Sequence, residues 1–165
     1  TIDPVADSLL REFEIVSRGI DDREGSVDSI FIRLDSIAGA TGNRQLKARS
    51  LYVKAWLYSS EGKENEAVAM LDSALALTDS VAYPYDRACM YIDQAYGVDG
   101  PWSDTYRRLQ NDLVVFKEAN DSFRVSQVYN FIGTINYVFG DDDGAVKNYT
   151  LAVDWLPAGM SIRSS

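Results

Sequence analysis

The feature that most constrains the fold of this chain is a helical spacing of apolar residues, interrupted at intervals by glycine. Val5, Leu9, Phe13 and Val16 follow one another at steps of three or four residues, which places them on one face of a helix. The same spacing continues along most of the 165 residues, and no stretch alternates apolar and polar residues for long enough to predict a strand. The sequence therefore predicts an all-α fold.

The glycines mark where these helices are expected to end, because glycine adopts the left-handed backbone of a helix terminus at little cost. Six of them stand at expected ends: Gly19, Gly42, Gly62, Gly100, Gly140 and Gly159. We expect about eight helices, the second of them capped by Ser26. The last six are expected over residues 45–60, 63–77, 85–97, from 101 onward, 123–139 and 143–156. Short turns between them indicate helical hairpins.

Composition narrows the possible chemistry. The chain has no histidine, which is the commonest general base and the commonest metal ligand. Its single cysteine, Cys89, provides neither an intramolecular disulfide nor a zinc site. Acidic residues outnumber basic ones by 25 to 16, so polyanions are repelled overall. We therefore expect no enzyme activity, no cofactor, no metal and no nucleic-acid partner.

Two further patterns bear on a metal site and on membrane insertion. Asp141, Asp142 and Asp143 are adjacent, whereas a calcium loop needs alternate ligands and a distal glutamate, so we expect this run to cap a helix. No run of apolar residues approaches the 18 needed to cross a membrane, so no membrane insertion of this chain is expected.

One segment shows a repeat pattern. Residues 126–157 read SQVYNFIGTINYVFGDDDGAVKNYTLAVDWLP. Within it, a Gly133 precedes the turn and a small–large–small trio, Ala145, Tyr149 and Ala152, follows it. Earlier in the chain, the offsets of these four residues are occupied by Ala55, Ala67, Leu71 and Ala74. Three more residues of that segment also fit the repeat pattern: Leu51, Tyr58 and Gly62. Small residues at these offsets let two antiparallel helices approach closely, at Ala55 with Ala67 and at Gly133 with Ala145.

This pattern resembles the tetratricopeptide repeat (TPR) family, whose repeat is a helix–turn–helix unit of 34 residues. The resemblance implies antiparallel helical hairpins stacked as a right-handed superhelix. It implies a single TPR-like domain over residues 1–165, with units at about 5–39, 45–79, 85–119 and 123–157. The second and fourth units match well, and the other two are degenerate. A generic all-α bundle is the alternative.

The resemblance also implies a function, a non-catalytic protein–protein interaction module that binds a peptide or protein segment in its concave groove. In the family, ligand-facing residues come from fixed positions of the first helix of each unit. Carried onto this chain, the partner-binding residues are Arg49, Tyr52, Trp56, Ser59, Tyr96, Gln127, Asn130, Thr134 and Tyr137. The aromatic members and Arg49 are of the types enriched at binding hot spots, although aromatic residues at helical spacing often pack in a core.

Other interpretations remain open at this stage. The sequence also looks like the repeat-containing sensory half of a bacterial, membrane-tethered signalling regulator whose output domain lies outside this chain. An enzyme is the third, disfavoured alternative. Asp-Ser followed by an apolar residue recurs five times and resembles an O-glycosylation signal of exported bacterial proteins, which favours an extracytoplasmic, periplasmic location over the cytoplasm. Neither the partner nor the oligomeric state can be read from the sequence.

Overall fold

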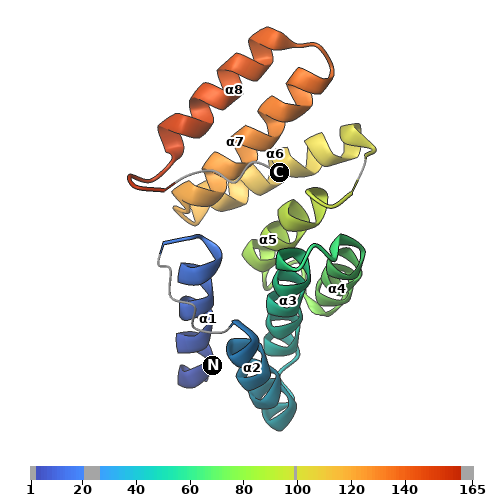
Figure 1. The fold of residues 1–165 in the computed structure, drawn as a ribbon, viewed down its shortest axis with the longest axis vertical. Helices are drawn as coiled ribbons and strands as arrows, with labels where there is room; N and C mark the ends of the chain where they lie inside the picture. Colours follow the sequence, from blue (N-terminus) through green and yellow to red (C-terminus); the bar gives the residue numbers. More distant parts are fainter. Residues whose placement is uncertain (1–2, 21–26, 99, 161–165) are drawn as a thin grey trace. The chain divides into compact units, whose positions relative to one another are not determined.

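The computed structural model describes residues 3–20, 27–98 and 100–160, and within these residues the chain is helical with no strand. It contains eight helices there (Figure 1), which confirms the all-α prediction. Their bounds are α1 (Pro4–Ser17), α2 (Val27–Thr41), α3 (Arg44–Ser60), α4 (Glu64–Leu77), α5 (Pro84–Ala95), α6 (Trp102–Glu118), α7 (Ser122–Val138) and α8 (Asp142–Trp155). Ser26, the expected cap of the second helix, lies outside the described residues.

The helix ends follow the chemistry expected of them. All six glycines predicted to close helices have positive φ angles, between 58° and 81°. Four of them directly follow a helix end, Gly19, Gly42, Gly62 and Gly140, whereas Gly100 precedes α6 and Gly159 lies beyond the end of α8. Asn120 adopts the same left-handed conformation between α6 and α7. At the opposite ends, side-chain oxygens of Asp3, Asn43 and Asp121 accept hydrogen bonds from the first free backbone N–H groups of α1, α3 and α7. Asp141 caps α8 in the same way, as the sequence predicted.

The chain divides into two compact units, residues 1–90 and 91–165, and the division falls within α5. In the first unit, α1, α2 and α3 share one core, whose buried members include Phe13, Leu34 and Val53. A second core joins α3, α4 and α5 through Ala55, Leu71, Ala74 and Met90, among others. The small residues of α3 and α4 are buried where these two antiparallel helices pack.

Two arginine side chains form hydrogen bonds with the C-terminal end of α4 in this unit. Arg44 of α3 donates hydrogen bonds to the carbonyl oxygens of Ala76 and Leu77. Arg87 of α5 donates to the carbonyl oxygens of Leu75 and Thr78, at 3.1 and 2.9 Å. The carbonyl groups that close an α-helix have no partner within the helix, so these side chains satisfy them from both neighbouring helices.

The second unit is built around α7, which is buried along most of its length. Leu109 and Phe116 of α6 and Ala145 and Ala152 of α8 are also buried, and α7 packs against both helices. A methyl group placed on Gly133 would lie only 2.8 Å from Cδ1 of Tyr149 on α8. The absence of a side chain at residue 133 therefore makes room for the Tyr149 ring between the two helices.

Candidate functional site

The predicted aromatic residues of α3 pack against the first helix of the chain. The ring of Phe13 on α1 meets the rings of Tyr52 and Trp56 edge to face, with centroid distances of 6.0 and 5.9 Å. Tyr52 and Trp56 are half-buried as a result. Helix α1 thus covers part of the α3 face that the family pattern assigns to a ligand, and only the remaining surface of these rings is open to one.

Arg49 has an ionic partner within its own unit. Its Nε donates to Oδ2 of Asp86 on α5 at 2.8 Å, and Gln45 of α3 donates to the same carboxylate. The guanidinium also lies 5.7 Å from the centroid of the Tyr83 ring. Because both partners of the ion pair are mostly buried, Arg49 ties α3 to α5. Ser59, farther along α3, is exposed and donates to Glu64.

The predicted residues of α7 differ in their exposure. Gln127 is buried, and Asn130 is half-buried. Thr134 is half-buried, and its hydroxyl lies 3.1 Å from the hydroxyl of Tyr149. Tyr137, in the last turn of α7, is exposed. Among these four side chains, Tyr137 is therefore the most accessible to a partner.

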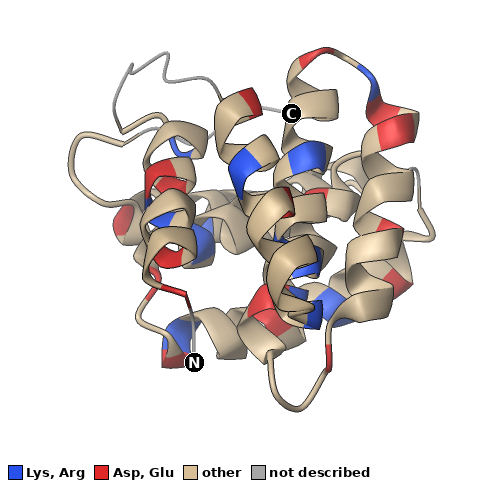
Figure 2. Cartoon of the chain, turned by 90° about the horizontal axis from the view of Figure 1, so that it is seen from below, with Lys and Arg blue, Asp and Glu red and all other residues tan. Residues whose placement is uncertain are grey.

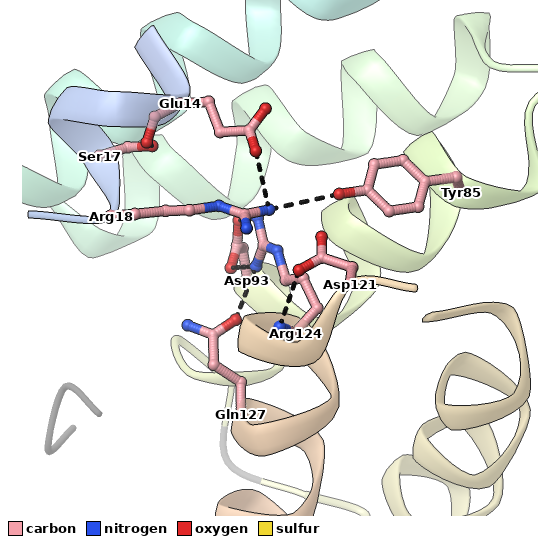
Figure 3. Close-up of polar contacts among 8 residues, drawn as sticks. All are labelled: Glu14, Ser17, Arg18, Tyr85, Asp93, Asp121, Arg124 and Gln127. Atoms are coloured by element: carbon pink, nitrogen blue, oxygen red, sulfur yellow. Dashed lines mark hydrogen bonds and ion pairs between the residues drawn. The ribbon is translucent and has the colours of Figure 1, made fainter. Parts of the chain in front are cut away.

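A buried polar cluster joins α5 and α7 in the second unit (Figure 3). Nη1 of Arg124 donates to Asp93 at 3.0 Å and to Oε1 of Gln127 at 2.9 Å. Tyr96, the remaining predicted residue, lies one turn after Asp93, and its ring packs 4.7 Å from that of Phe131. Burial, together with the negative charge of Asp93, raises the pKa of Tyr96. The half-buried Tyr96 side chain therefore stays protonated and packs against Phe131.

Figure 3 also shows polar contacts within the first unit. Arg18, at the end of α1, is bonded to Tyr85 of α5 and pairs with Glu14 one turn earlier in its own helix. These contacts give the end of α1 a polar attachment in addition to its apolar core. They hold α1 in the position from which Phe13 reaches Tyr52 and Trp56.

An open hollow of about 620 Å³ lies between α6 and the end of α7 in the second unit. Three aromatic side chains take part in it, Trp102, Tyr106 and Phe139. Three amide side chains also line the hollow, those of Gln110, Asn111 and Asn136. The rest of the wall consists of two charged residues, Arg107 and Asp141, together with Ser103 and Ile135. Aromatic surface edged by hydrogen-bonding amides is the combination that orients a peptide, because the rings bury apolar side chains while amides pair with a peptide backbone.

Apolar exposure continues beside this hollow. Tyr137, Val138 and Phe139 are consecutive, and all three are more than half exposed. Trp102 is half-buried, and its ring lies 6.3 Å from that of Phe131, which fixes it at the start of α6. The hollow therefore combines one anchored ring with aromatic residues that remain open to solvent.

A larger hollow, of about 1000 Å³, lies around the end of α4 in the first unit. Its wall is mostly polar and includes Arg44 and Arg87. Both guanidinium groups donate to carbonyl oxygens of α4, so these N–H groups are engaged within the protein.

Figure 2 shows acidic and basic residues on several helices. The two signs are divided between the paired helices of the first unit, because α3 has four basic residues and no acidic one, whereas α4 has three acidic residues and no basic one. Within the described parts of the chain, no group of acidic residues and cysteine is arranged to hold a metal ion. No helix in those parts is long and apolar enough to cross a membrane.

Trp102, Tyr106 and Phe139 are not among the binding residues predicted from the sequence. A usable signal was present, because three apolar residues in a row, 137–139, directly precede a helix-ending glycine. Apolar residues on one buried helix face recur every three or four positions, so three in a row cannot all lie on that face.

Comparison of the chain with protein-family models, with curated proteins and with solved structures finds no match.

Proposed function

We propose that this protein is a non-catalytic interaction module of the TPR type, and that it binds a peptide segment of a partner protein. The hollow between α6 and α7 carries the proposal, because Trp102, Tyr106 and Phe139 offer aromatic surface there beside the amides of Gln110 and Asn111. The partner segment supplies one large apolar side chain to the rings and its backbone to the amides. The repeat pattern and the close packing of α3 with α4 and of α7 with α8 support the TPR assignment.

The proposal relocates the expected contact surface toward the end of α7. Tyr137 belongs both to the family-derived set and to the exposed apolar run beside the hollow. Tyr52 and Trp56 remain available as a secondary contact through the surface that Phe13 leaves uncovered.

The test is a peptide-display selection on the immobilised full chain, followed by affinity measurements on the selected peptides. Phe139→Ala is the main variant and Val153→Ala on α8 is its control, since their side chains are similarly exposed, at 67% and 68%, and Val153 is not part of the hollow. We expect Phe139→Ala and Tyr106→Ala each to weaken binding at least tenfold, a loss typical of a binding hot spot. Val153→Ala should leave the affinity unchanged.

Two results would count against this function. A selection that yields no peptide binding above its scrambled control would contradict the interaction module itself. Peptides that tolerate Phe139→Ala and Tyr106→Ala but lose affinity with Trp56→Ala would move the site to α3.

A further inference from the structure

The outer face of α8 has an exposed apolar strip along its length. Ala145 and Ala152 are buried on the side of the helix that packs against α7 (Figure 1). On the opposite side, Val146 and Val153 are 66% and 68% exposed, and Thr150 between them is exposed as well. Steps of four and three residues return to the same face of a helix. These three side chains therefore form one strip, which the described chain leaves open to solvent.

Two charged side chains follow one edge of this strip. Lys147 comes directly after the first valine and Asp154 directly after the second, and both are exposed. They are seven residues apart, which is about two turns of an α-helix, so they lie on the same edge. Neither forms an ion pair with the described residues of its own chain. The edge therefore has a positive group near one end and a negative group near the other.

This arrangement is complementary to itself. When a twofold axis relates two antiparallel helices, the same edge of both helices comes together. The midpoint between Val146 and Val153 lies within one residue of Thr150, and so does the midpoint between the two charged residues. An axis at Thr150 therefore places each valine opposite the other valine of the second copy. It also places each Lys147 opposite an Asp154, twice in the dimer.

The remaining charges of the chain favour this contact over others between two copies. With the axis at Thr150, residues 145–155 of one copy face the same residues of the other. Lys147 and Asp154 are the only charged residues in this segment, so no two like charges lie opposite each other within it. The segment is neutral, whereas the whole chain has a net charge of −9, which disfavours contact between most other parts of two copies.

We propose that α8 pairs with α8 of a second copy of this chain, in an antiparallel dimer held by the valine strip and two Lys147–Asp154 ion pairs. The paired segment is about 16 Å long. One helix pair of this length buries less than the roughly 1,200 Å² of a stable complex. The dimer is therefore weak and reversible, with a Kd of about 0.1 mM. None of its contact residues belongs to the hollow between α6 and α7, so the dimer does not depend on peptide binding there.

The test is sedimentation equilibrium of the full chain at concentrations from about 10 µM to about 1 mM. We expect the average mass to rise from that of one chain toward that of two. Lys147→Asp and Asp154→Lys each place like charges opposite one another twice, so each should raise the Kd at least about tenfold. Asp143→Lys is the matched control, because it makes the same change of charge on α8 outside the paired segment, and it should alter the Kd less than about threefold.

A mixture of the two charge variants separates this contact from other modes of association. When Lys147→Asp and Asp154→Lys chains pair with each other, both ion pairs again join opposite charges, so the mixture should associate about as strongly as the unmodified chain. Circular dichroism checks that both variants keep their helices. The proposal is overturned if the unmodified chain stays monomeric at about 1 mM, or if Asp143→Lys weakens the dimer as much as Asp154→Lys does. It is also overturned if the mixture associates no more strongly than either variant alone.

Discussion

Gly133 provides a direct test of how α7 and α8 pack. Replacing a helical glycine with alanine normally stabilises a helix by about 1 kcal/mol, because alanine loses less backbone entropy on folding. Here the added methyl group would lie 2.8 and 2.9 Å from two atoms of the Tyr149 ring. The ring has little freedom to withdraw, since its hydroxyl is hydrogen-bonded to Thr134 of α7.

We expect the clash to outweigh the gain in helix propensity. Overfilling a packed interior costs roughly 1–3 kcal/mol. Gly133→Ala should therefore lower the free energy of unfolding of the second unit by about 1 kcal/mol. Gly39→Ala, in α2, is the control: nothing lies within 4 Å of a methyl group placed there, so this variant should be more stable by about 0.5–1 kcal/mol.

The assay is urea unfolding followed by circular dichroism, with hydrogen exchange of α7 and α8 to assign the change to the second unit. A double-mutant cycle with Tyr149→Leu measures the coupling, because leucine removes the ring that the methyl group meets. Tyr149→Leu should cost about 1 kcal/mol less in the Gly133→Ala background than in the unmodified chain. The reasoning fails if Gly133→Ala stabilises the protein as much as Gly39→Ala does.

Three further predictions concern polar groups. Asn43→Ala removes the side chain that accepts from the Leu46 N–H at the start of α3, so urea unfolding should show a loss of about 1 kcal/mol, whereas Asn43→Asp should retain the stability. Asp93→Asn removes a charge that pairs with the buried Arg124 and should lower the free energy of unfolding by about 2 kcal/mol. In a double-mutant cycle with Arg124→Lys, the loss in the double variant should be smaller than the sum of the two single losses. Burial raises the pKa of Asp112 to about 7. Between about pH 4 and pH 7 the Asp112 carboxyl group is therefore protonated in the folded chain and ionised in the unfolded chain. The free energy of unfolding consequently falls as the pH rises through that range. Asp112→Asn should therefore raise the unfolding free energy by roughly 2 kcal/mol at pH 8 and change it little at pH 4, and equal effects at both pH values would disprove the assignment.

The helices could be predicted from the sequence because their determinants are local. Residues 45–60 were expected to form a helix, and α3 is Arg44–Ser60. The glycines at the helix ends need only their own backbone freedom to act, so no knowledge of packing was required. Eight helices in the described chain follow from these two signals together.

The environment of the family-derived residues was not predictable in the same way. Whether Tyr52 and Trp56 face solvent depends on where α1 lies, and that is a contact between residues about 40 positions apart. Asp112 is different, because a signal was available: it lies three residues after Leu109 and four before Phe116, on the same helix face. A charged residue among buried neighbours at this spacing indicates a buried carboxyl group.

The way in which α4 ends has a consequence for solution conditions. Arg44 and Arg87 reach the carbonyl oxygens of residues 75–78, so each of these bonds joins a cation to a peptide dipole and not to a second ion. Added salt weakens attraction between separated full charges far more than it weakens a direct hydrogen bond. The junction of α3, α4 and α5 should thus persist in concentrated salt, where an exposed ion pair such as that of Lys47 with Asp35 loses its contribution.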